Sequence, residues 1–254
     1  MDLAIKIPRI LERHDKLKKS STALSDYITL LEDAKALIAE STEWIKKFEK
    51  DGRRYRRVNL NEIEGYDASE FHSPFRNHTT EGKAKEHETK VNRFENHGAA
   101  NCYLVYWMAM IILQTTISQL TQYVTTQYSQ QQARRKDQSP FTDSQEENQA
   151  ARSDLDFSTF FSSLLSPDPR AAIPNLVKYA INVCLSIPFC TRPQAGFVGR
   201  FSILMPLAVA QKLFTAMGKE EEATWCGKMW KKTSVPGLYN ASVGEGVNER
   251  YINP

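Results

Sequence analysis

The fold is decided by residues 99–128, AANCYLVYWMAMIILQTTISQLTQYVTTQY, a stretch without a charged side chain. Its first half is apolar on nearly every side, which is typical of a helix that is buried on most of its surface. A membrane-spanning helix needs about 20 consecutive apolar residues, whereas this run is broken at Gln114, Thr115 and Thr116. We therefore predict a central core helix, rich in aromatic residues, and no membrane span.

Helical spacing of apolar residues predicts six further helices along the chain. They cover residues 2–17, 26–50, 155–165, 169–187, 201–217 and 220–233. Asp51 and Gly52 are expected to end the second of these helices, and Pro188 the one that starts at residue 169. No run of residues alternates with period two. The predicted fold class is therefore all-α: a single domain over residues 1–254 of about seven helices, built around the buried aromatic-rich central helix.

Two segments between the predicted helices are too polar or too irregular to build a core. Residues 53–97 form a highly charged, irregular excursion that is expected to become helical again from about Lys85 towards His97. Residues 129–154 are rich in Gln, Ser, Asp, Glu and Arg, so we predict a long disordered loop there. The tail from Val235 to Pro254 is expected to be irregular as well.

Charge and cysteine content exclude several classes of protein. The net charge of +3 is too small to indicate a DNA-binding surface, so no direct contact with nucleic acid is predicted. The four cysteines contain no C-x2-C pair and are expected to be free thiols, as in a reducing compartment. The N-terminal residues mix charged and apolar side chains, unlike a signal peptide. An intracellular protein, cytoplasmic or nuclear, is the prediction.

The sequence lacks the motifs of the common catalytic and metal sites. It contains no G-x-S-x-G, no G-x-G-x-x-G and no Walker loop. His87 and Glu88 begin a zinc-type H-E-x-x-H pattern, but Val91 stands where its second histidine belongs. The basic run Arg53–Arg57 could contact phosphate or serve as a nuclear-import signal. The alternative is a solvated run that follows a helix end, where cations suit the helix dipole. We predict neither a metal nor a cofactor.

Candidate site residues are the aromatic and polar side chains on the most apolar helices. The aromatic stripe suits a packed core, and it equally suits the wall of a small-molecule pocket between helices; both interpretations stay open. The predicted ligand-binding residues are Tyr106, Trp107, Met110, Asn182, Phe201, Met205 and Gln211. The predicted catalytic residues are Tyr103 and Gln114, since a hydrogen bond from either could polarise a substrate carbonyl.

The second half of the chain resembles a known family. Residues 172–232 contain a helix that ends in Ser-Ile-Pro-Phe at 186–189, a Gly-containing loop, the apolar segment Met205-Pro206-Leu207 and a helix with Trp225-Cys226. In this order they are similar to the C-terminal part of the fungal-specific regulatory domain of zinc-cluster transcription factors. The stretch NCYLVYW at 101–107 is similar to the central helix of that domain, and IKIPRILERHDKL at 5–17 looks like another segment of these proteins.

The resemblance implies a regulatory role, but the six-cysteine zinc cluster with which the family reads DNA is not matched by the four scattered cysteines here. The missing cluster fits an excised domain of such a transcription factor, and it also fits a natural stand-alone relative. We predict a stand-alone relative that binds an apolar small molecule in a secondary-metabolite pathway. The alternative is a cofactor-independent cyclase or pericyclase that folds a terpenoid or polyketide in the same pocket. A homodimer, or a helper subunit for another transcription factor, is also left open.

Overall fold

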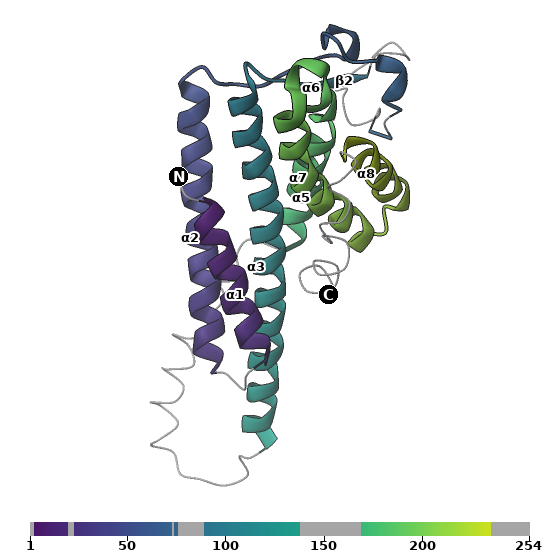
Figure 1. Ribbon diagram of the computed structural model, residues 1–254. Helices are drawn as coiled ribbons and strands as arrows, with labels where there is room; N and C mark the ends of the chain where they lie inside the picture. Colours follow the sequence, from purple (N-terminus) through teal and green to yellow (C-terminus); the bar gives the residue numbers. More distant parts are fainter. Residues whose placement is uncertain (1–2, 20–22, 73, 76–88, 138–168, 235–254) are drawn as a thin grey trace.

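The computed structural model describes residues 3–19, 23–72, 74–75, 89–137 and 169–234. Its longest element is α3 (His97–Asp137), along which the other helices pack. Figure 1 shows α1 (Leu3–Lys19) and α2 (Leu24–Lys50) on one side of α3, and α5 (Pro169–Cys184), α7 (Gly196–Ala216) and α8 (Glu220–Thr233) on the other. The all-α prediction is confirmed: the part of the chain that is described contains only two four-residue strands.

Two apolar cores lie along α3. One joins α1 and α2 to the C-terminal half of α3 around Leu30, Leu31 and Leu120. The other surrounds the N-terminal half of α3 and receives side chains from α5, α7 and α8, among them Phe214 and Trp225. The most apolar part of α3 is long enough to cross a membrane, and 56% of it is buried inside the protein. That burial is what a core helix needs.

α3 is longer than predicted at both ends. Asn96 caps its N-terminus, because the Asn96 side-chain oxygen accepts a hydrogen bond from the backbone N–H of Ala99 at 2.8 Å. At the other end α3 continues past Tyr128 to Asp137, so the prediction of a loop from residue 129 is wrong for 129–137. Gln, Ala, Arg and Lys are good helix formers, and neither Gly nor Pro interrupts these nine residues. The rest of the predicted loop, the helix at 155–165 and the tail lie outside the described residues.

The charged excursion contains a small sheet that the sequence did not predict. β1 (Arg56–Asn59) pairs antiparallel with β2 (Lys90–Arg93), and Val58 lies opposite Val91. The predicted return to helix before His97 is therefore wrong for residues 90–93. Both valines are buried, and the backbone N–H of Asn92 donates to the carbonyl of Leu185 at 2.8 Å. Packing against the end of α5 thus determines a strand that is too short to show alternation.

The connection between α5 and α7 also differs from the prediction. α5 ends at Cys184 and a short helix, α6 (Ile187–Thr191), begins with Pro188 in its first turn. Proline is favoured there because its missing N–H would have no helical partner. Pro188 therefore starts a helix where it was expected to end one. A 3-10 turn, η4 (Pro193–Ala195), then leads into α7 at Gly196, five residues earlier than predicted.

Candidate functional site

Two of the predicted site residues, Tyr103 and Trp107, lie in an aromatic cluster centred on Tyr55. The ring of Tyr55 is 4.9 Å from that of Tyr103 and 5.2 Å from that of Trp107, both edge to face. The Tyr103 hydroxyl donates to Glu49 Oε1 at 3.2 Å. Burial raises the pKa of Tyr103, and the Glu49 carboxylate raises it further. Tyr103 is therefore a protonated donor whose proton is already engaged within the protein.

Asn182 belongs to a buried polar network beside this cluster. Its Oδ1 accepts a hydrogen bond from Arg57 Nη2 at 2.6 Å. Its backbone oxygen accepts one from Asn92 Nδ2 at 2.8 Å, and Asn92 Nδ2 also donates to Ser186 Oγ at 3.0 Å. Tyr106 packs nearby in α3 against Tyr179 of α5, with ring centroids 6.0 Å apart. The hydrogen bonds connect β1 and β2 to the C-terminal end of α5, and the Tyr106–Tyr179 ring contact adds α3, so these residues support the fold.

The remaining predicted residues are spread along the molecule. Met110 is buried in the core. Gln114 lies eleven residues beyond Tyr103 in α3, which is about 16 Å along the helix axis, so the two predicted catalytic residues cannot contact one small substrate together. Phe201 and Met205 are exposed on α7. Gln211 is half-buried and lies against Gly227 of α8. The described geometry therefore does not assemble the predicted pocket.

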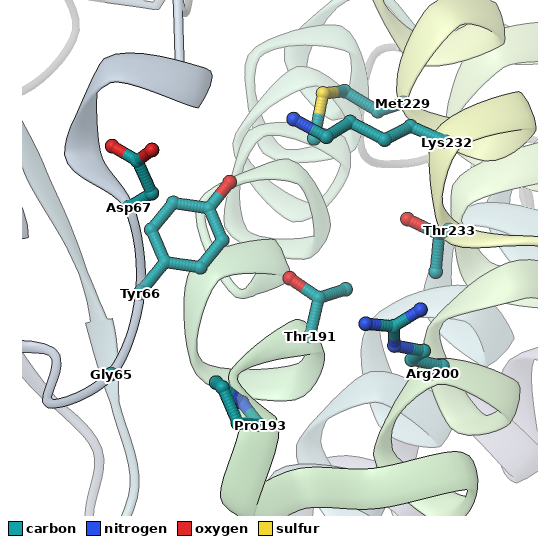
Figure 2. A pocket seen from close by; sticks show the side chains of 9 residues that line it. All are labelled: Gly65, Tyr66, Asp67, Thr191, Pro193, Arg200, Met229, Lys232 and Thr233. Atoms are coloured by element: carbon teal, nitrogen blue, oxygen red, sulfur yellow. The ribbon is translucent and has the colours of Figure 1, made fainter.

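A cavity of about 190 Å³ lies elsewhere, where the segment between β1 and β2 meets α6, η4, α7 and α8 (Figure 2). It is lined by Gly65, Tyr66, Asp67, Thr191, Pro193, Arg200, Met229, Lys232 and Thr233. Figure 2 shows the side chains of Tyr66, Thr191 and Arg200 around one central space, bordered by Lys232 and Thr233 of α8. We call this space the Tyr66–Arg200 cavity. No predicted site residue lines it.

The wall that carries Tyr66 is held in place by a tight turn and a cap. Gly65 has φ +75°, which favours glycine, and a Cβ on it would meet the side chain of Gln194 in η4 at 2.9 Å. Asp67 caps the short 3-10 helix η2 (Ala68–Glu70), accepting from the Ser69 backbone N–H at 2.9 Å and from its hydroxyl at 2.6 Å. These hydrogen bonds hold the pKa of Asp67 below its ordinary value.

The lining combines cationic, hydroxyl and apolar groups. Arg200 and Lys232 contribute positive charge, and Asp67 carries the one carboxylate of the lining. Tyr66 and the two threonines contribute hydroxyls, while Met229 and Pro193 contribute apolar surface. A planar guanidinium suits bidentate hydrogen bonding to a carboxylate or phosphate. The arrangement is chemically suited to an anion attached to a small apolar body.

Metal and thiol chemistry have no support in the described part of the chain. No group of three His, Cys, Asp or Glu side chains is placed there to hold a metal ion. The cysteines are free thiols, as predicted, and Cys184, Cys190 and Cys226 are buried. Cys102 is half-buried. Burial raises the pKa of Cys190 to about 12, so this thiol stays protonated and unreactive at neutral pH.

Comparison with known proteins adds no assignment: no family model, curated protein or solved structure matches the chain. The resemblance to the fungal regulatory domain therefore stays a prediction, as do the apolar ligand and the cyclase alternative.

Proposed function

We propose that the protein is a regulatory module that binds a small anionic molecule in the Tyr66–Arg200 cavity. The observation that carries this proposal is the position of Arg200 and Lys232 on the wall of one cavity, with hydroxyl groups from three different elements around them. Hydrogen bonds from charged donors to carboxylate or phosphate oxygens are about twice as strong as neutral ones. The single carboxylate in the lining, on Asp67, accepts hydrogen bonds from Ser69 and is also attracted to Lys232, so Arg200 is the principal anion-binding group of the proposal.

The size of the cavity limits the ligand. Pockets for drug-sized molecules enclose about 300–1,000 Å³, whereas this cavity encloses about 190 Å³. A single ring or short chain with one carboxylate or phosphate group is therefore the proposed ligand class. Its apolar part would lie along Met229 and Pro193. This ligand is smaller and more polar than the metabolite expected from the sequence.

A regulatory role follows from which elements the ligand would join. The cavity walls come from the turn at Gly65, from α6 and η4, from the second turn of α7 and from the C-terminal end of α8. A ligand that contacts all of them favours the arrangement in which they are close together, and its binding energy shifts the population towards that arrangement. This mode of action agrees with the family resemblance and requires neither a metal nor a cofactor.

The test is a calorimetric titration of the purified protein with sodium benzoate and, separately, with inorganic phosphate. Benzamide, the uncharged analogue of benzoate, serves as the ligand control. Arg200→Gln removes a charged donor and should weaken anion binding about tenfold to a hundredfold, the equivalent of one hydrogen bond to a charged group. Lys231→Gln is the matched control, because Lys231 is an exposed neighbour of Lys232 that does not line the cavity.

The expected result is binding of at least one of the two anions, weak or absent binding of benzamide, and a loss in Arg200→Gln that Lys231→Gln does not reproduce. Equal affinity of the wild type and Arg200→Gln for the anion would contradict the proposal. So would the absence of heat with both anions at millimolar concentration.

A further inference from the structure

α7 presents a strip of large apolar side chains to solvent. The strip consists of Phe197, Val198, Phe201 and Met205, whose exposed fractions are 56%, 71%, 56% and 45%. Phe197 and Phe201 stack with ring centroids 5.9 Å apart and planes inclined by only 19°. Single exposed apolar residues are common, but a contiguous strip marks an interaction surface. We call this set the α7 strip.

The rest of α7 is fully used by the fold, so the strip is not needed to hold the helix in place. Ile203, Leu207, Ala210 and Phe214 are buried, and α7 packs against α3, α5 and α8. The N-terminus of α7 is also fixed, because a Cβ on Gly199 would lie 2.4 Å from the carbonyl oxygen of Cys190. The strip is therefore displayed on a rigid support, which reduces the entropy lost when a partner binds.

We propose that the α7 strip is the docking site for an amphipathic α-helix of a partner protein, with acidic residues along the margin of its apolar face. This inference goes beyond the proposed function and does not depend on it. Phe197, Phe201 and Met205 are spaced i, i+4, i+8 and form one ridge about 12 Å long. Such a ridge packs into the groove between the corresponding ridges of a second helix.

The charge of the surroundings selects an acidic partner. α7 contains no Asp or Glu, and its exposed Arg200 stands next to Phe201 at the edge of the strip. Lys232 of α8 lines the same cavity as Arg200 but shares it with the Asp67 carboxylate, so Arg200 is the cation that borders the strip. Complementary charge at the rim of an apolar contact steers association and excludes wrong partners.

The same charges argue against a second copy of this chain. In an α7–α7 pair, Arg200 of each copy would approach the edge of the other copy's strip, and α7 contains no Asp or Glu that could pair with it. Like charges at an interface disfavour the pairing. An anionic membrane would also attract a cationic rim with apolar side chains, but a single straight ridge of stacked rings is shaped for another helix.

The experiment uses fluorescence anisotropy of a labelled 16-residue amphipathic peptide with leucine at helical i, i+3, i+4, i+7 spacing and glutamate at the other positions. A second peptide carries lysine in place of glutamate. The double variant Phe197→Ser/Phe201→Ser removes the ridge, and Met205→Ser shortens it. Ile5→Ser is the matched control, since Ile5 is a similarly exposed apolar residue on α1. Circular dichroism melting establishes that each variant is folded.

The glutamate peptide should bind the wild type and Ile5→Ser alike, and bind the double variant at least tenfold more weakly, with a smaller loss in Met205→Ser. The lysine peptide should bind at least tenfold more weakly than the glutamate peptide. Three results would overturn the inference. One is equal peptide binding by wild type and double variant. The others are strip-dependent binding to phosphatidylserine vesicles without peptide binding, and a strip-dependent dimer in sedimentation velocity. Benzoate or phosphate binding by the double variant should be unchanged, which separates this test from that of the cavity.

Discussion

Gly199 is the residue at which one added methyl group should disturb the molecule most. It lies in the first turn of α7, is buried, and faces the end of α6. A Cβ at this position would be 2.4 Å from the carbonyl oxygen of Cys190 and 2.5 Å from the Cβ of Ala195. Carbon atoms attract one another at about 3.5–4.0 Å, so both contacts are about 1 Å too short. Neither atom belongs to a side chain that can rotate away.

The magnitude follows from two opposing effects of Gly199→Ala. Alanine favours the helical state by about 1 kcal/mol relative to glycine. Adding a methyl group to a closely packed core costs about 1–3 kcal/mol, and the upper end applies here because backbone must move. The net loss in the free energy of unfolding should be about 1–2 kcal/mol. For a chain of this size, that lowers Tm by about 2–8 °C.

The assay is urea unfolding followed by circular dichroism, and Gly227→Ala in α8 is its control. A Cβ on Gly227 would meet chiefly the Gln211 side-chain nitrogen, at 2.9 Å. That nitrogen is the far end of a flexible side chain and can move at little cost. Helix propensity should therefore dominate, and Gly227→Ala should be neutral or stabilising by up to about 1 kcal/mol. If Gly199→Ala also stabilised the protein, the close contact between α6 and α7 would be refuted.

Three further predictions concern the cores and the polar network. Burial lowers the pKa of His14 from 6.5 to about 4, so on acidification the unfolded state takes up the proton first. The contribution of neutral His14 to the free energy of unfolding is therefore complete above about pH 6.5. It falls by on the order of 3 kcal/mol as the pH drops to about 4. His14→Leu should flatten the dependence of the urea midpoint on pH in this window. Asn92→Leu removes two buried side-chain hydrogen bonds and should lower the free energy of unfolding by about 1–3 kcal/mol. Tyr103→Phe removes one hydrogen bond to Glu49 and should cost about 1 kcal/mol by the same assay.

The main helices could be predicted from the sequence because each leaves a periodic signal of its own. α3 has a long uncharged run, and α8 has apolar residues at helical spacing between an acidic first turn and a basic last turn. The end of α2 at Asp51-Gly52 was also predictable, since Gly52 adopts φ +83° just after the last helical residue. In each case the information lies within one segment of the chain.

The strands and the cavity could not be predicted, because their causes lie in distant segments. Val91 is in a strand since Val58 lies opposite it and Leu185 accepts a backbone hydrogen bond beside it. Neither relation is visible along residues 85–97. The Tyr66–Arg200 cavity likewise takes its walls from separate stretches of chain, and each of them looks unremarkable alone.

The start of α7 at Gly196 accounts for both proposed surfaces. The sequence predicted that this helix begins only at Phe201, so Phe197 and Val198 were expected to lie before its first residue. The helical start instead places Phe197 one turn before Phe201, so that their rings stack on one face. It also places Arg200 in the first two turns, at the wall of the cavity. The left-handed φ of +55° at Gly196 lets the chain turn sharply from η4 into the helix. One glycine conformation thus positions the cationic group for the anion and the apolar ridge for the partner helix.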